Sequence, residues 1–117
     1  MNLAMRIRAL LLISGVLALA ACGEPLGKQA MIAGCRASAA ALEPALTPEA
    51  MDYRAVVGRE AILRFQVTAD GGAARAVNAK CKVGMGGHLK RIKLDAVRVR
   101  GAEFERAQAA FAAATGR

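Results

Sequence analysis

Residues 60–83, which read EAILRFQVTADGGAARAVNAKCKV, decide the fold of this chain. Apolar and polar residues alternate in both halves of the stretch, which is the pattern of a strand with one buried face. In the first half, Leu63, Phe65 and Val67 point to one side. Asp70-Gly71-Gly72 separates the halves and supplies the residue types of a tight hairpin turn. The stretch therefore predicts two antiparallel strands joined by a turn.

Two separate periodicities bring two cysteines to the same predicted core. The second strand carries Cys81 on its apolar side, in a set with Val77, Ala79 and Val83. Upstream, a helical spacing of three and four residues defines one apolar face. That face consists of Met31, Cys35, Ser38, Ala39 and Leu42. The helix face and the strand face should therefore pack on each other, with Cys35 and Cys81 both inside.

Short-range signals place the elements around the first helix. It should end near Leu42, because Glu43 precedes a proline and such residues avoid the helical conformation. Thr47-Pro48-Glu49 then has an N-cap residue, a proline in the first turn and an acid beside it. These residues predict a short helix that runs to about Val56 and stops at Gly58, with Met51 and either Tyr53 or Val57 packed inward.

The segment after the hairpin predicts another strand or two and a last helix. Gly84-Met85-Gly86-Gly87 is typical of a turn, and a third strand should start near Leu89 with Ile92 and Leu94 inward. After Asp95-Ala96 the apolar phase shifts to Val97 and Val99, which indicates a bulge or a sharp turn into a short extra strand. The last helix follows Gly101 and ends at Gly116. Its apolar stripe is Phe104, Ala107, Phe111 and Ala114.

Together these elements predict a small single α+β domain. It has an N-terminal helix, a three- or four-stranded antiparallel sheet and a C-terminal helix, and both helices cover one face of the sheet. The opposite sheet face is then polar and basic. Its predicted anion-binding residues, called the basic face below, are Arg64, Lys80, Lys82, Arg91 and Lys93.

Positive charge is concentrated in one part of the chain. The formal net charge is +8, and residues 75–100 hold eight basic residues against a single acid, Asp95. A basic surface of this kind suits anionic lipid head groups, lipopolysaccharide phosphates or an acidic envelope protein. The alternative is a solvated sheet face whose lysines discourage aggregation.

The N-terminal residues have the features of an export signal. Arg6 and Arg8 precede an uncharged apolar run from residue 9 to residue 19. The apolar stretch is shorter than the roughly 20 residues that a membrane-spanning helix needs. The four residues Leu19-Ala20-Ala21-Cys22 resemble the lipobox of bacterial lipoproteins. The resemblance implies cleavage before Cys22, a diacylglyceryl thioether on its sulfur, and a lipid anchor that holds the protein in the bacterial envelope, facing the periplasm.

This reading divides the chain into three parts. Residues 1–21 form the lipoprotein signal peptide, residues 22–28 the lipidated anchor and tether, and residues 29–117 the folded domain. In enterobacterial lipoproteins, an aspartate directly after the lipidated cysteine resembles an inner-membrane retention signal. This chain has Gly23 at that position, so the outer membrane is slightly favoured over the inner one. An exported protein is not expected to bind nucleic acid.

Two other cleavage patterns are present in the sequence. Ala18-Leu19-Ala20 fits the site of an ordinary soluble export signal. Ile32-Ala33-Gly34-Cys35 matches the lipobox pattern as well, but Glu24, Pro25 and Lys28 separate it from the apolar run. Cys22 is therefore the preferred lipidation site.

Lipidation of Cys22 leaves Cys35 and Cys81 as a pair. In an oxidising compartment a lone pair is typical of a disulfide, and closing a loop of this length stabilises a domain by roughly 4 kcal/mol. The alternative is two separate buried thiols.

The sequence contains little that points to catalysis. One serine, one histidine and one tyrosine follow residue 22, namely Ser38, His88 and Tyr53, and they form no recognisable catalytic pattern. Met85 and His88 are two soft ligands that suit copper(I), too few to predict a site, so no metal or cofactor is expected. The leading hypothesis is a non-catalytic binding or scaffolding lipoprotein. The alternatives are an inhibitor or chaperone of an envelope enzyme, acting through residues 84–88, and a periplasmic metal handler.

Overall fold

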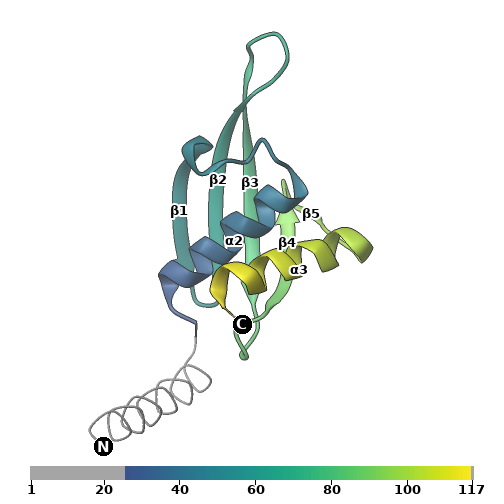
Figure 1. The fold of residues 1–117 in the computed structure, drawn as a ribbon. Coiled ribbons are helices and arrows are strands. Elements are labelled where there is room, and N and C mark those ends of the chain that lie inside the picture. Colours follow the sequence, from purple (N-terminus) through teal and green to yellow (C-terminus); the bar gives the residue numbers. More distant parts are fainter. Residues whose placement is uncertain (1–25, 117) are drawn as a thin grey trace, which may run out of the picture.

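The computed structural model describes residues 26–116, which form one sheet covered on one face by two helices (Figure 1). The chain begins with helix α2 (Lys28–Leu42) and a 3-10 turn, η1 (Pro48–Ala50). The strands are β1 (Met51–Val57), β2 (Glu60–Thr68), β3 (Ala74–Val83), β4 (Leu89–Leu94) and β5 (Val97–Arg98), and helix α3 (Gly101–Thr115) follows. All strand pairs are antiparallel and the strands lie in chain order. The predicted α+β architecture is confirmed, but the sheet has five strands and not the predicted three or four.

The predicted signal peptide and Cys22 lie outside the described residues. Within residues 26–116, no helix has the length and apolar character needed to cross a membrane.

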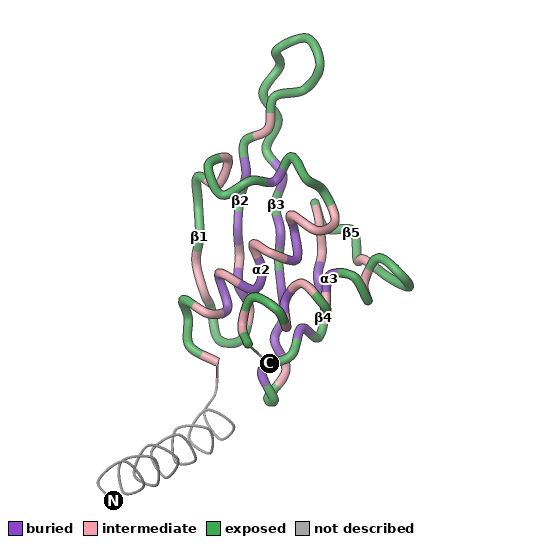
Figure 2. Tube along the Cα trace, in the orientation of Figure 1, coloured by how far each residue is buried: buried purple, intermediate pink, exposed green. Residues whose placement is uncertain are grey.

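The core lies between the sheet and the two helices, as Figure 2 shows by the buried positions along β2, β3 and α2. The predicted alternation is confirmed: the inward residues of β2 and β3 are buried or pack against the core. One buried polar side chain is satisfied across the helix pair, because the Ser38 hydroxyl donates a hydrogen bond of 2.8 Å to the Ala107 carbonyl. Ser38 thus serves packing between α2 and α3.

The two helices approach each other closely at Gly34 of α2. A Cβ atom added there would lie 2.5–2.9 Å from three ring carbons of Phe111, which is buried on α3. Ala107 and Phe111 form the buried stripe of α3 and Phe104 packs at its edge, whereas Ala114 is exposed, contrary to prediction. The absence of a side chain at Gly34 therefore sets the distance between the helices.

A disulfide between Cys35 and Cys81 joins α2 to β3 near the C-terminal end of the strand. Both cysteines are fully buried, and their Cα atoms lie 5.7 Å apart. The predicted pairing is therefore present, and it links the helix layer to the sheet at the centre of the core.

One element differs from the prediction: the short helix expected up to Val56 is a strand. Thr47 does cap a turn, since its hydroxyl accepts a hydrogen bond of 3.3 Å from the Ala50 amide, but the turn is only η1. From Met51 onward the chain pairs with β2 as far as Val57, and the two strands are joined by the two residues 58–59. Met51 packs against the core as expected, while Tyr53 and Val57 are exposed.

The physical reason is competition for the backbone hydrogen bonds. A helix of fewer than a dozen residues is marginal in water. Pairing with β2 instead satisfies the backbone hydrogen-bonding groups on one side of residues 51–57. Tyrosine and valine also favour strands, and this segment contains Tyr53, Val56 and Val57. Glycine at the first position of a two-residue loop is a hairpin signal. Gly58, with φ 61°, occupies that position and was interpreted as a helix stop.

The turn between β4 and β5 is the sharp turn that the sequence predicted. Its two central residues, Asp95 and Ala96, have φ of 51° and 68°, the signs of a type I′ hairpin. A left-handed backbone costs a residue with a Cβ about 1–2 kcal/mol. Asp95 is partly compensated, because its carboxylate accepts a 2.9 Å hydrogen bond from the Asn78 amide. Ala96 has no side-chain hydrogen bond that could offset the free-energy cost of its left-handed backbone conformation.

Ala96→Gly is therefore expected to stabilise the domain by about 1 kcal/mol. The midpoint of chemical unfolding of the full-length protein measures this change. Ala73→Gly is the matched control, since Ala73 is an exposed turn residue without a positive φ, and glycine there should be neutral or destabilising. An Ala96→Gly protein no more stable than the Ala73→Gly protein would contradict the assignment of strain to Ala96.

Candidate functional site: the basic sheet face

The sheet face opposite the helices carries its side chains in rows that cross the strands. The pairing registers define one row directly: Lys80 of β3 lies opposite Lys93 of β4, which lies opposite Arg98 of β5. We call these three residues the cationic row. In the next row, Lys82 lies opposite Arg91 on one side and Glu60 on the other. Since paired residues share a face, the five predicted basic-face residues do lie on one surface.

The cationic row has no acidic partner. Among residues 26–116, no carboxylate oxygen lies within 4.0 Å of the charged nitrogens of Lys80, Lys93 or Arg98. Like charges directly opposite each other on neighbouring strands destabilise a sheet. This surface therefore carries positive charges that no ion pair among the described residues neutralises.

Arg64 is the one predicted basic-face residue that the structure neutralises. Its Nε donates a 2.9 Å hydrogen bond to the Asp52 carboxylate, and its guanidinium lies 5.6 Å from the centre of the Tyr53 ring. Gln66 donates a second bond to the same carboxylate. The hydrogen bonds from Arg64 and Gln66 lower the pKa of Asp52 below its usual value, and the same ion pair raises the pKa of Arg64. Arg64 therefore differs from the other basic-face residues, because its charge already has an acidic partner.

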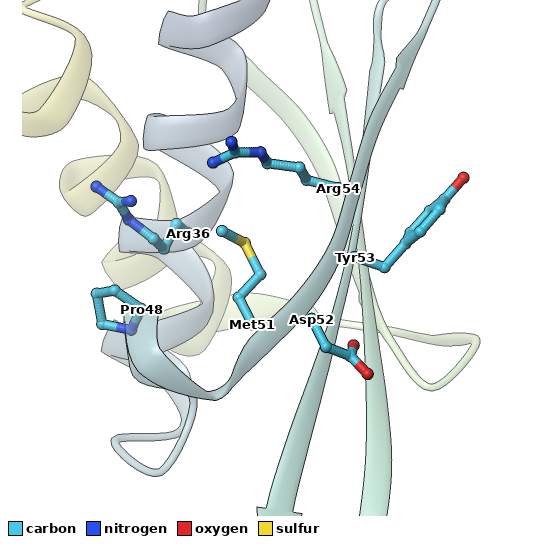
Figure 3. Close-up of a pocket in the computed structure, with 6 residues that line it drawn as sticks. All are labelled: Arg36, Pro48, Met51, Asp52, Tyr53 and Arg54. Atoms are coloured by element: carbon cyan, nitrogen blue, oxygen red, sulfur yellow. The ribbon is translucent and has the colours of Figure 1, made fainter.

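A β-bulge explains why this pair was missed. The register between β1 and β2 shifts around Asp52, which has no partner residue on β2. Asp52 consequently lies on the same face as Tyr53 rather than opposite it (Figure 3). Because these residues were predicted to be helical, nothing in the sequence pattern placed Asp52 beside Arg64.

Arg98 is the residue that completes the row and was not predicted as part of it. The turn at Asp95-Ala96 and the alternation after it were recognised, and together they place Arg98 opposite Lys93. Beside the row, a shallow hollow is lined by Asn78, Lys80, Lys93, Asp95 and Ala96. The Asp95 carboxylate already forms an ion pair, because a guanidinium nitrogen of Arg75 lies 3.6 Å from one of its oxygens. The arrangement places cationic side chains where an anion could contact them at the surface.

The turn at residues 84–88 is compact. The Gly84 amide donates to the His88 carbonyl at 2.8 Å, and the His88 ring lies directly over Gly84. Met85, at the tip, is 80% exposed. Within residues 26–116, no three His, Cys, Asp or Glu side chains are grouped as metal ligands would be.

Comparisons with known proteins identify no relative of this chain. No protein-family model, curated protein or solved structure matches this chain. The functional interpretation therefore depends on the residues described above.

Proposed function

We propose that this chain is a lipid-anchored protein of the bacterial envelope that binds an anionic, phosphate-bearing membrane surface through its cationic row and catalyses no reaction. The observation that carries the proposal is the alignment of Lys80, Lys93 and Arg98 across three adjacent strands without an acidic partner among the described residues. Adjacent strands are about 4.8 Å apart, so the row presents three cations on a rigid surface.

Solubility alone is a weak explanation for this row. Charges of both signs keep a surface soluble, and alternating them across strands would also favour pairing. Instead, like charges are opposed in two successive rows, at Lys80 and Lys93 and at Lys82 and Arg91. Opposed like charges destabilise the free protein. Their presence is explained if a bound anion compensates the positive charge.

The location follows from the resemblance of residues 19–22 to a lipobox. The rival match at residues 32–35 lies inside α2, and the Cys35 sulfur is bonded to Cys81. Cys35 therefore has no thiol to receive a lipid, which leaves Cys22 as the candidate. An anchor at Cys22 would hold the domain beside membrane surfaces, where each basic residue near an anionic surface contributes about 1 kcal/mol. Three such residues amount to about a hundredfold in affinity.

Vesicle capture tests the proposal with the mature lipidated protein, which begins at Cys22. The protein is reconstituted in phosphatidylcholine vesicles through its own anchor, and the capture of fluorescent vesicles rich in phosphatidylglycerol is measured. We expect capture that weakens as salt is added and falls at least tenfold for the double variant Lys80→Glu, Lys93→Glu. Mass spectrometry of the N-terminal peptide should show the diacylglyceryl thioether on Cys22.

A matched variant separates the cationic row from net charge. Lys28→Glu with Arg106→Glu changes the net charge equally, but these exposed residues belong to the helix layer. Its capture should stay close to that of the wild type. Equal losses in both double variants, or equal capture of pure phosphatidylcholine vesicles, would show that the row does not bind an anionic membrane.

A further inference from the structure

The free edge of β1 is a second surface, at the opposite end of the sheet from the cationic row. β1 is the first strand in the sheet order and pairs with β2 on one side. Among residues 26–116, no strand pairs with its other side, which Figure 1 shows as an open margin of the sheet. The unpaired backbone groups of an edge strand are a ready template for another extended chain.

A hollow lies over this edge. Its lining residues are Arg36, Pro48, Met51, Asp52, Tyr53 and Arg54. Figure 3 shows that the side chains of Arg54 and Met51 point toward α2, which carries Arg36, while Tyr53 and Asp52 point to the opposite side of the strand. Because both faces of β1 contribute to the lining, the hollow follows the edge of the strand and not one of its faces.

The charge of this hollow is positive. Among the described residues, no carboxylate lies within 4.0 Å of the guanidinium nitrogens of Arg36 or Arg54. The one acid in the lining, Asp52, is held by Arg64 and Gln66 on the far side of the strand. Two arginines are thus left to face whatever lies along the edge, with the partly buried side chain of Met51 near them.

Arg54 also limits which chains can pair with the edge. A charge on the inward side of an edge strand is a device that discourages edge-to-edge pairing. A second copy of this chain would bring its own Arg36 and Arg54 to the same hollow, and like charges at such a contact are unfavourable. An acidic segment removes this penalty, because its carboxylates match the planar donors of arginine.

We propose that the β1 edge binds an extended acidic peptide segment of a partner protein as a sixth strand. Backbone hydrogen bonds to β1 supply the pairing, and the side chains on one face of the segment supply the selectivity. Its carboxylates lie toward Arg36 and Arg54, and an apolar side chain lies over Met51. This inference does not depend on the proposed membrane contact, which uses the other end of the sheet.

Peptide binding to the full-length protein in detergent micelles tests the inference. The probe is a fluorescent peptide of alternating valine and glutamate, and the comparison is its lysine counterpart. Fluorescence anisotropy should show at least tenfold tighter binding of the glutamate peptide. Amide hydrogen exchange should slow in residues 53–57 when it binds. The double variant Arg36→Glu, Arg54→Glu breaks no ion pair among residues 26–116 and should reverse the preference.

Two further probes distinguish strand pairing from simple charge attraction. Glutamate peptides N-methylated at alternate residues, either odd or even, each lose the amide donors of one edge. Since only one edge of the peptide faces β1, one isomer should bind and the other should not. Equal binding of both isomers, unchanged preference in the arginine variant, or equal loss in the Lys80→Glu, Lys93→Glu variant would overturn the proposal. So would a stable dimer in sedimentation that excludes the peptide.

Discussion

The free energy of unfolding of the full-length protein is expected to fall by roughly 4 kcal/mol when both Cys35→Ala and Cys81→Ala are introduced, relative to the oxidised wild type. The two residues are 46 positions apart, so the bond removes a large part of the conformational freedom of the unfolded chain. A domain of this length has a thin core, and total stabilities are only about 5–15 kcal/mol. The disulfide therefore accounts for a large share of the stability.

Urea unfolding in detergent micelles measures this loss. Reduction of the wild type should lower its midpoint to near that of the alanine variant, while the variant itself should not respond to the reductant. Alanine is the appropriate replacement because both cysteines are fully buried. A serine pair would add about 1–3 kcal/mol for each buried hydroxyl left without a partner. A wild-type midpoint that reduction leaves unchanged would show that the bond does not stabilise the fold.

The hairpin of β2 and β3 was predictable because its signals are local and agree. Alternation along both strands fixes which side is buried, and Asp70-Gly71-Gly72 marks the turn, where Gly71 and Gly72 have φ of 98° and 86°. The connection is longer than the predicted tight turn, because residues 69–73 lie between the paired Thr68 and Ala74. A one-residue slip would expose every apolar side chain. The disulfide followed from the same agreement, since the helix period and the strand period each turned one cysteine toward the core.

β1 was not predictable in the same way, because its local signals conflict. Thr47 and Pro48 do begin a helical turn, and only the tertiary pairing with β2 decides that the turn ends after Ala50. The error spread to the candidate site. With residues 51–57 interpreted as helix, the sheet appeared to end at β2, so the neutralisation of Arg64 and the free edge beside Arg54 were both hidden.

The two proposed surfaces show how the sheet separates its charges. At the β5 end, the cationic row crosses three strands and forms part of a broad face. At the β1 end, Asp52 neutralises the face by pairing with Arg64, and the unpaired arginines lie along the edge and beside α2. The two proposals use different residues at opposite ends of the sheet, and together they predict that a membrane and a peptide can be bound at the same time.

The contact between Gly34 and Phe111 makes a second large effect testable. Gly34→Val is expected to destabilise the protein by about 3 kcal/mol or more, because the new side chain needs space that the Phe111 ring already fills. Gly34→Ala sets two opposing effects against each other. Alanine gains up to about 1 kcal/mol of helix propensity, but overpacking costs about 1–3 kcal/mol, so a net loss is expected.

A double-mutant cycle isolates the steric effect. In a Phe111→Ala background, itself expected to cost about 3–5 kcal/mol, the ring is gone and only the helix propensity remains. Gly34→Ala should then stabilise the protein, so the sign of its effect reverses between the two backgrounds. Urea midpoints of the four proteins give the coupling between the two positions. If Gly34→Ala has the same effect in both backgrounds, the Phe111 ring does not limit how closely the helices approach at Gly34.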